Sequence, residues 1–265
     1  MKKVALIGCG ALGGLVARHF ALAGEGWKLT SVMAKTPAHA ECLAEETGAK
    51  AVATIDDLLA ANPDLVIETA GIGAVKAYAE TILKAGIDLM IVSIGALADH
   101  EYYELLEETA RTNGARLYVA NGAIGGFDAM RTYRLMGADE VTITSTKAPK
   151  SLQGAPGLGE RVLSETEDEV VFEGSMEEAI AGFPKNVNVG VATAVATERA
   201  DTRVRIVSRP TTKENGHFIT IRGPRLHAEM MFCSEPDPAN PRSSTSTAYS
   251  VLAFLKNLHS PVVFF

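Results

Sequence analysis

The first fourteen residues constrain the fold more than any other part of the chain. A short apolar run from Val4 to Ile7 ends at a glycine, and an amphipathic pattern typical of a helix covers residues 12–23. Glycines between these two patterns let a buried strand turn sharply into a helix whose free N–H groups face an anion. A strand-to-helix turn without a ligand is the alternative. The pattern predicts a phosphate-binding turn for a dinucleotide, formed by Gly8, Gly10, Ala11, Leu12 and Gly13.

The end of the second expected strand bears on the choice between NAD and NADP. That strand covers residues 27–33 and is followed by Ala34 and Lys35, with no acidic residue. An acidic side chain about 20 residues beyond the glycines holds the ribose hydroxyls of NAD, whereas a basic one can pair with the 2′-phosphate of NADP. Lys35 therefore favours tolerance of NADP, and a lysine that only caps a surface loop is the alternative.

Strands and helices alternate regularly through the first half of the chain. The pattern predicts helices at 37–48, 56–62, 74–85 and 100–112, and strands at 51–54, 65–70, 89–93 and 116–120. Asp99 is the expected cap of the helix at 100–112. Small residues follow several strands, among them Ala70, Ser93 and Ala123, and such exits line the ligand crevice of an open sheet. We therefore expect an α/β fold with a Rossmann-type doubly wound parallel sheet over residues 1–121.

Beyond residue 137 the pattern changes. Alternating strands are expected near 141–146, 170–172, 204–206, 218–220 and 228–232, and helices near 175–183 and 186–198. Ser175 and Glu178 have the spacing of a capping box at the start of the helix near 175–183. Loops rich in glycine or proline are expected at 148–159 and 234–242. These segments predict a second α+β domain over residues 122–242, with a mostly antiparallel sheet that could carry an oligomer interface. A last helix at about 243–259 is expected to pack back on the first domain.

Composition narrows the class of partner. The net charge is −7 and no basic stripe is present, so nucleic acid is not an expected partner. No apolar run approaches the roughly 18–20 residues of a membrane span, and the chain passes from Met1 directly into a strand, which predicts a cytoplasmic protein without a signal segment. Three scattered cysteines disfavour a disulfide framework and a zinc site.

Histidine is the side chain best suited to proton transfer near neutral pH. The chain has no paired-histidine metal motif and no GxSxG nucleophile motif. We expect surface positions for four of its six histidines, and a structural role for His227 is as plausible as a functional one. His217 differs, because it follows an expected turn at Asn215 and Gly216 and begins a strand that could aim its imidazole into a cleft. The four expected surface histidines are His19, His39, His100 and His259.

Seven short motifs, in their order and spacing, resemble the L-aspartate dehydrogenase family over nearly the whole chain. They lie at residues 8–13, 68–70, 93–97, 122–125, 184–189, 215–217 and 240–244. The resemblance implies NAD(P)-dependent oxidative deamination of L-aspartate to iminosuccinate, which hydrolyses to oxaloacetate or feeds NAD biosynthesis, or the reverse reductive amination. The expected partners are a small amino or oxo dicarboxylic acid and a second copy of the chain in a homodimer.

The resemblance also implies roles for individual residues. Ala123 and Asn188 correspond to nucleotide contacts of the family, and His217 corresponds to its active-site histidine. A dicarboxylate needs cationic partners, and Lys147 lies where the family tends to carry a basic residue followed by proline. Lys147 is therefore the substrate-binding candidate, and a solvated lysine at a strand end is the alternative.

Two segments depart from the family pattern. Residues 208–210 read Ser-Arg-Pro where the family usually has Ala-Asp-Pro, and residues 223–227 read Gly-Pro-Arg-Leu-His. Both are expected near the substrate side. Two alternatives therefore stay open, which are a dehydrogenase or reductase for another small amino, imino or oxo acid, and a dinucleotide-binding sensor without catalysis.

Overall fold

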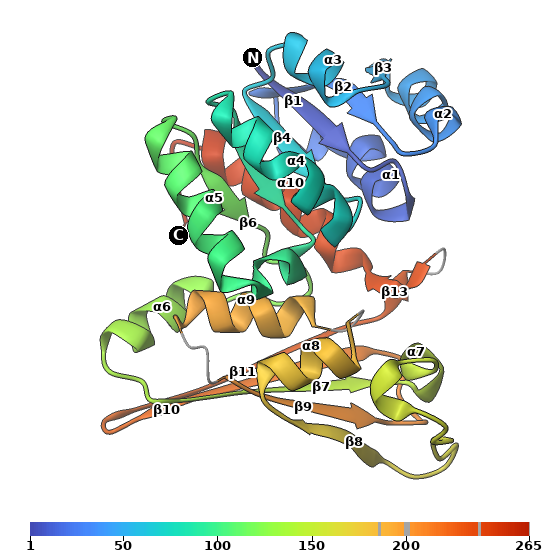
Figure 1. The fold of residues 1–265 in the computed structure, drawn as a ribbon, viewed down its shortest axis with the longest axis vertical. Coiled ribbons are helices and arrows are strands. Elements are labelled where there is room, and N and C mark those ends of the chain that lie inside the picture. The colour runs from blue at the N-terminus through green and yellow to red at the C-terminus, as the bar shows by residue number, and fades with distance from the viewer. Residues whose placement is uncertain (185–186, 199–201, 238–239, 265) are drawn as a thin grey trace. The chain divides into compact units, whose positions relative to one another are not determined.

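The structure is a computed structural model that describes residues 1–184, 187–198, 202–237 and 240–264 (Figure 1). The chain divides into two compact units, one formed by Met1–Ala120 with Thr247–Phe265 and the other by Asn121–Ser246. Each unit contains its own large sheet. Among the described residues, no helix is both long and apolar enough to cross a membrane.

The first unit contains a six-stranded sheet in which every neighbouring pair is parallel. The strand order β3-β2-β1-β4-β5-β6 is that of a Rossmann fold, and it confirms the predicted doubly wound sheet. Its strands are β1 (Lys2–Ile7), β2 (Trp27–Met33), β3 (Lys50–Val52), β4 (Leu65–Glu68), β5 (Asp88–Ile91) and β6 (Leu117–Val119).

Helices cover both faces of this sheet, which explains why its central strands are almost entirely apolar (Figure 1). One face packs against three of these helices, α1, α2 and α10, through a continuous buried cluster. The indole Nε1 of Trp27 also donates a 2.7 Å hydrogen bond to the carbonyl of Leu255, which fixes α10 to this unit. The helices of the unit are α1 (Ala11–Arg18), α2 (Pro37–Thr47), α3 (Ile55–Ala60), α4 (Ile72–Lys84), α5 (His100–Thr112) and α10 (Thr245–His259).

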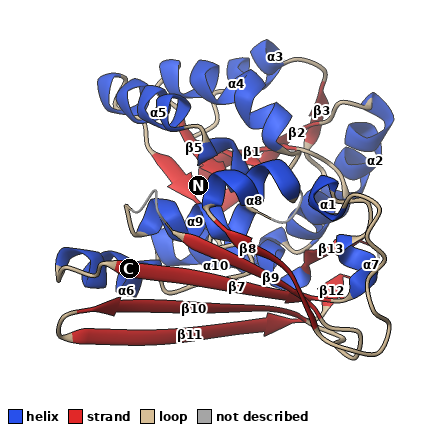
Figure 2. Ribbon diagram, turned by 60° about the horizontal axis from the view of Figure 1, so that its bottom comes forward, coloured by secondary structure: helices blue, strands red, loops and turns tan. Residues whose placement is uncertain are grey.

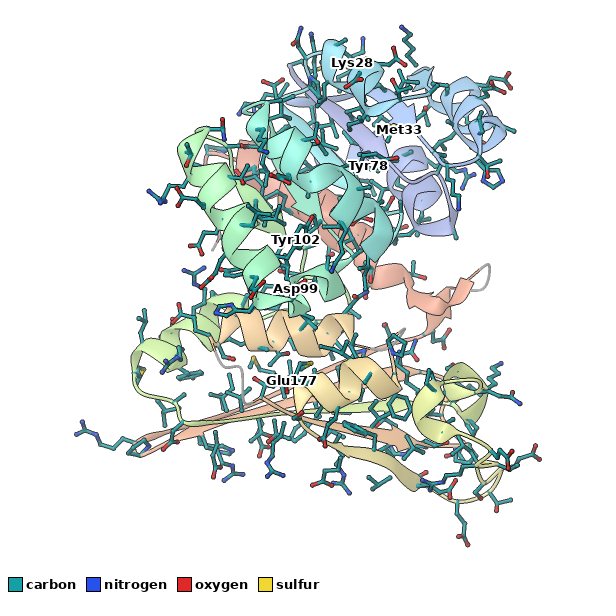
Figure 3. The ribbon with its side chains drawn as sticks, viewed as in Figure 1. Lys28, Met33, Tyr78, Asp99, Tyr102 and Glu177 are labelled. Atoms are coloured by element: carbon teal, nitrogen blue, oxygen red, sulfur yellow. The ribbon has the colours of Figure 1, made fainter. Side chains whose placement is uncertain are left out.

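Local sequence signals place several helix ends. The side chain of Asp99 accepts a hydrogen bond from the backbone N–H of Tyr102 at 3.2 Å, which confirms the predicted cap of α5 (Figure 3). Gly48 ends α2 in the left-handed conformation that glycine adopts without steric penalty. In the second unit, Ser175 and Glu178 form the predicted capping box.

The second unit is built on a five-stranded sheet of order β11-β10-β7-β9-β8, in which only β7 and β9 pair in parallel. Its helices lie on one face of the sheet and leave the other face open (Figure 2). The mostly antiparallel sheet and the α+β architecture are as predicted. Its elements are α6 (Phe127–Leu135), β7 (Glu140–Lys147), α7 (Pro149–Leu152), β8 (Glu169–Gly174), α8 (Met176–Gly182), α9 (Asn188–Ala196), β9 (Arg203–Ser208), β10 (Asn215–Gly223) and β11 (Leu226–Ser234).

Three sequence-based expectations about local structure were wrong. The first helix ends at Arg18 and a separate 3₁₀ turn covers Phe20–Ala23, because the backbone at His19 leaves the helical conformation. The expected loop at 148–159 contains α7, which begins at Pro149, since proline is preorganised for a first helical turn. The expected loop at 234–242 contains the paired strands β12 (Pro236–Asp237) and β13 (Asn240–Ser244), while residues 238–239 lie outside the described part.

Candidate functional site

Two glycines of the first turn are required by the protein itself. Gly8 has φ +105°, and a Cβ there would lie 2.7 Å from the backbone nitrogen of Ala70. A Cβ on Gly13 would collide with the carbonyl oxygen of Gly8 and would lie 2.6 Å from Thr69 Oγ1. Any side chain at either position would therefore push β1, α1 and the exit of β4 apart.

No close contact within the described part of the protein requires a glycine at position 10. Its φ is −76°, which any residue adopts, and a Cβ there would meet nothing within 4 Å. It precedes α1, where no side chain caps the helix and no acidic residue lies in the first turn. The first-turn N–H groups of a helix have no carbonyl partner of their own, so this end presents donors to an anion. Gly10, Ala11 and Leu12 thus form an open cradle that fits the pyrophosphate of a dinucleotide.

The end of β2 lies beside this cradle. The backbone N–H of Gly8 donates to the carbonyl of Met33 at 2.8 Å. Figure 3 labels Met33 and Lys28, the latter near the start of the same strand. Lys35 follows Met33 by two residues and is exposed in the connection to α2. Its position suits contact with the adenosine ribose, where NAD and NADP differ.

The exits of β4 and β5 are joined by a buried carboxylate that sequence reasoning overlooked. Glu68 is 2% exposed, and its Oε1 accepts hydrogen bonds from the N–H groups of Ala70 at 2.6 Å and Gly71 at 2.7 Å. Ser93 donates its hydroxyl to Oε1 at 2.9 Å and its N–H to Oε2 at 3.1 Å. Burial raises the pKa of Glu68, and the four hydrogen bonds oppose that rise. A single carboxylate within the apolar run 65–70 was the available signal.

In the second unit, polar side chains gather at one end of the helix-covered sheet face. Along β7 and β9 the buried positions begin as valine and isoleucine and then change to polar residues, and along the antiparallel β10 the order is reversed. The register places His217 opposite Ser145, and Lys147 opposite Ser208. Because residues two apart in a strand share a face, Ser145 and Lys147 point to the same side. The sheet therefore carries a buried polar cluster of Ser145, Lys147, Ser208, Asn215 and His217.

His217 is held rigidly within this cluster. The residue is 3% exposed, and its ring atom Nδ1 lies 2.9 Å from Ser145 Oγ. Burial, and secondly the charge of Lys147, lower the pKa of His217 to about 3. The ring is therefore neutral at pH 7 in the unliganded protein. The prediction of a turn at Asn215 and Gly216 was wrong. Both residues belong to β10, where they pair with neighbouring strands, and the strand begins before the histidine.

Lys147 is not a solvated lysine. The residue is 8% exposed, and burial lowers the pKa of its ammonium group from 10.5 to about 8. A cation this deeply buried is costly unless it serves an anionic ligand or another compensating group. Of the two alternatives at this position, the structure thus excludes the exposed strand end, and Lys147 remains the candidate for a substrate carboxylate.

The remaining residues considered as functional candidates in the sequence are distributed over both units. Ala123 occupies a half-buried turn in the segment after β6, and Asn188 is the exposed first residue of α9. Part of the motif at 184–189 falls on residues 185–186, outside the described residues. His227 lies on the open sheet face with its ring 3.1 Å from Glu229, so it is separate from the polar cluster. His39, His100 and His259 are exposed as expected, whereas His19 is half-buried.

The two segments that depart from the family pattern, residues 208–210 and 223–227, lie in different parts of the second sheet. Ser208 is fully buried, and its Oγ has no hydrogen-bond partner among the described residues. Arg209 pairs with Asp168 at 2.7 Å at the surface. Residues 223–226 form the hairpin between β10 and β11, six residues or about 20 Å from His217 along the strand. The expectation that this second segment lies at the substrate side was therefore wrong, since it marks the opposite end of the sheet.

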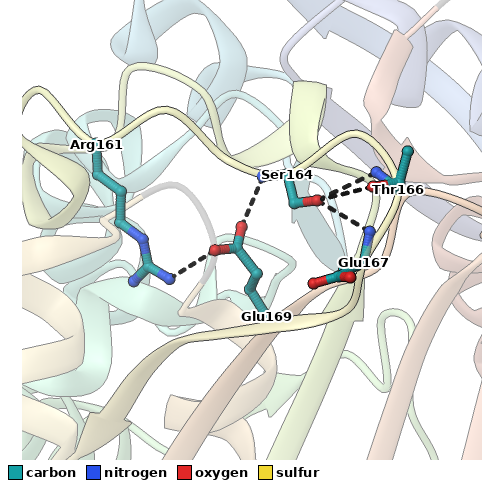
Figure 4. A network of polar contacts seen from close by, with 5 residues as sticks. All are labelled: Arg161, Ser164, Thr166, Glu167 and Glu169. Atoms are coloured by element: carbon teal, nitrogen blue, oxygen red, sulfur yellow. Dashed lines mark hydrogen bonds and ion pairs between the residues drawn. The ribbon is translucent and has the colours of Figure 1, made fainter.

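A cavity of about 640 Å³ begins directly beyond the strand ends that carry Lys147 and Ser208. Its lining includes Ala148 and Pro149 after β7 and Pro210 after β9. The segment before β8 forms another part of the lining, and it is tied by the Arg161–Glu169 ion pair at 3.1 Å and by hydrogen bonds of Ser164 (Figure 4). Among the described residues, no group of three or more histidine, cysteine or acidic side chains could hold a metal.

A Rossmann sheet with an open anion cradle, accompanied by a separate α+β unit with a buried lysine and histidine, defines a dinucleotide-dependent oxidoreductase of two units. Residues 8–120 match the model of the NAD binding domain of homoserine dehydrogenase, and residues 128–258 match that of the C-terminal domain of aspartate dehydrogenase. The cofactor is accordingly NAD or NADP.

Whole-chain comparisons identify the family. The chain is 35% identical over 263 residues to L-aspartate dehydrogenase of Methanospirillum hungatei, covering 99% of both chains. It is 36% identical over 265 residues to the enzyme of that name from Methanocaldococcus jannaschii, covering 99% of this chain and 98% of the relative. The crystal structure of aspartate dehydrogenase from Thermotoga maritima superposes with a TM-score of 0.76 at 27% identity, covering 100% of both chains. The chain belongs to the L-aspartate dehydrogenase family.

Proposed function

We propose that this protein catalyses the NAD(P)-dependent oxidative deamination of L-aspartate to iminosuccinate, and the reverse reductive amination. The observation that carries the proposal is that a buried cation, Lys147, and a buried neutral imidazole, His217, share one sheet face of a chain in this family. An amino dicarboxylic acid needs both a cationic partner and a proton acceptor.

His217 is the proposed proton acceptor. Oxidised nicotinamide, when bound, accepts the hydride that leaves the substrate Cα. If Nδ1–H donates to Ser145 Oγ, the lone pair of Nε2 is free to take the proton released from the substrate amine. The same imidazolium can later return a proton during attack of water on the imine. Ser145 therefore selects the tautomer and orients the ring.

Lys147 is the proposed partner of a substrate carboxylate. Its positive charge is one of the two causes that lower the pKa of His217. A carboxylate bound at Lys147 neutralises this charge, so substrate binding raises the pKa of the imidazole toward its ordinary value. The substrate thereby makes His217 a stronger base when it is needed.

The proposed cofactor contacts begin with the glycine turn and the strand exits of the first unit. Gly8, Gly10, Ala11, Leu12 and Gly13 hold the pyrophosphate, and Lys35 lies toward the adenosine ribose. Ala70 and Ser93 supply the exits of β4 and β5. Ala123 and Asn188 are proposed as further contacts on the resemblance to the family.

A coenzyme-by-substrate panel tests this function. We expect NAD(P)H absorbance to rise with L-aspartate and to fall with oxaloacetate plus ammonia. No change in absorbance with L-aspartate or with oxaloacetate plus ammonia, combined with turnover of another amino or oxo acid, would favour a second candidate function. That function is a dehydrogenase for a different small acid. The unpartnered, fully buried hydroxyl of Ser208 beside Lys147 is the observation that favours that candidate.

Coenzyme choice is tested by Lys35→Asp. Because the ammonium group is proposed to face the ribose, reversal of its charge should weaken NADP binding about tenfold or more and leave NAD binding nearly unchanged. Isothermal titration with both coenzymes measures the effect. Lys28→Asp is the matched control, since Lys28 is also exposed on β2 but lies near its other end. Equal losses for NAD and NADP would contradict the role assigned to Lys35.

We propose further that the enzyme works in the cytoplasm as a homodimer, without a nucleic-acid partner. The open face of the second sheet supports a dimer, because Met231 is 70% exposed and lies opposite Phe218, which is 37% exposed. Met231→Glu should convert a dimer into a monomer in analytical ultracentrifugation. Leu22→Glu is the control, since that exposed side chain lies in the first unit. A wild-type monomer, or a dimer unaffected by Met231→Glu, would reject this interface.

A further inference from the structure

Glu68 connects the strand exits at which the cofactor is proposed to bind. It is the last residue of β4, beside Ile7 of β1 and Ile91 of β5 in the parallel register. The strand order reverses between β1 and β4, and ligands of open α/β sheets bind outside the strand ends at this point. Its carboxylate therefore lies at the centre of the proposed cofactor groove.

The contacts of Glu68 come from donors alone. Four hydrogen bonds reach its two oxygens, three of them from backbone N–H groups and one from the Ser93 hydroxyl. No lysine, arginine or histidine of the described residues forms an ion pair with it. A set of donors around a carboxylate stabilises its ionised form. The exits of β4 and β5 are thus joined through a buried negative charge without a cationic partner.

The neighbouring residue extends this connection to the glycine turn. Thr69 donates its hydroxyl to the carbonyl of Gly8 at 2.9 Å, and its N–H bonds to the carbonyl of Ile7 at 2.8 Å. Glu68 and Thr69 together therefore hold the exits of β1, β4 and β5. A protein that needed only rigidity here could use neutral groups, because burying a charge without a counter-ion is costly. The choice of a charge without a counter-ion therefore requires a further explanation.

The oxidised nicotinamide of the cofactor offers an explanation for the buried charge of Glu68. Its ring carries a positive charge that the reduced ring lacks, and a buried anion acts on such a charge through a medium of low dielectric constant. We propose that Glu68 is a positioning residue for the dinucleotide, whose carboxylate fixes the exits of β4 and β5 and whose charge favours the oxidised cofactor over the reduced one. This inference rests on the proposed function, because it assumes the cofactor groove described above.

Two substitutions separate the two roles. Glu68→Gln keeps the size of the side chain and the three bonds to Oε1 but removes the charge and opposes the N–H of Ser93 with an amide NH₂. Glu68→Asp keeps the charge but is one methylene too short to bridge both exits. Ser93→Ala is the matched control, since it removes one hydroxyl donor and leaves the carboxylate in place.

The readout is the dissociation constant of each variant for oxidised and reduced cofactor, measured by isothermal titration calorimetry. We expect Glu68→Gln to weaken binding of the oxidised form about tenfold more than that of the reduced form. Glu68→Asp and Ser93→Ala should weaken both forms by the same factor. A ratio of the two constants that Glu68→Gln leaves unchanged would overturn the inference. A thermal melt checks folding first, and Glu68→Met, which is neutral and of similar length, replaces an unfolded Glu68→Gln.

Failure of this inference can be told apart from failure of the proposed function. If the wild-type protein binds neither form of NAD or NADP, both proposals fall. If it binds them and oxidises aspartate while Glu68→Gln keeps the wild-type ratio of dissociation constants, only the role of Glu68 is rejected.

Discussion

Replacement of His217 by asparagine should lower kcat for aspartate oxidation by ~10²-fold or more, while the dissociation constant for the cofactor stays within about twofold. Asparagine cannot exchange a proton, so the amine proton would lose its acceptor. Cofactor affinity should persist because the glycine turn belongs to the other compact unit, which has its own core. Steady-state kinetics and calorimetric titration with NAD(P)H measure the two quantities separately.

A second histidine provides the control for this experiment. His227 lies on β11, where its side chain is 51% exposed and contacts Glu229 on the open face of the sheet. His227→Asn should leave kcat unchanged. Equal losses in both variants would indicate a general effect on the sheet, and an unchanged rate in His217→Asn would reject the assignment of the proton acceptor.

Local sequence signals predicted those parts of the fold that depend on short-range geometry. The glycine spacing at residues 8–13, the cap at Asp99 and the capping box at Ser175 each act within a few residues, and the structure contains all three. The Asn215–Gly216 pair also predicted a turn, and here the prediction failed. Pairing of Asn215 with β11, and of Gly216 with both β7 and β11, outweighed their preference for turns, because that pairing depends on residues distant in the chain.

The candidate site was predictable only in part for the same reason. His217 and Lys147 were nominated from the sequence, but their burial follows from the covering of one sheet face, which no local pattern specifies. Ser145 was missed although the alternation of residues 141–147 places it in phase with the buried Val141 and Ile143. The role of Glu68 was missed because its partner Ser93 lies 25 residues away, just beyond the end of the neighbouring strand β5.

Replacement of Lys147 by methionine should abolish dicarboxylate binding, because methionine carries no charge that attracts a carboxylate. The folded protein lowers the pKa of Lys147 from 10.5 to about 8, which corresponds to about 3 kcal/mol at most. Below pH 8 the lysine is charged in both the folded and unfolded states, so the whole penalty of burying the charge is present. Methionine does not titrate, so the contribution of this position to the pH dependence of unfolding should disappear in the variant, which thermal melts between about pH 7 and 10 measure.

The lowered pKa of Lys147 also determines how this residue makes the stability of the wild-type protein depend on pH. Between pH 8 and 10.5 the unfolded state binds more protons at Lys147 than the folded state does, so this group makes the protein more stable as the pH rises through that window, and the gain is lost as the pH falls back through about 8. Ligand affinity should move in the opposite direction, because a neutral lysine no longer attracts a carboxylate. Succinate is the appropriate probe, since it carries two carboxylates and no amine that titrates.

The inhibition constant of succinate should therefore increase above about pH 8 in the wild-type enzyme. Lys147→Arg should move this loss of affinity to higher pH, because guanidinium remains charged there. Lys28→Met is the control, since Lys28 is exposed on β2 of the first unit and should affect neither the inhibition constant nor its pH dependence. Unaltered succinate inhibition in Lys147→Met would show that another group binds the carboxylate.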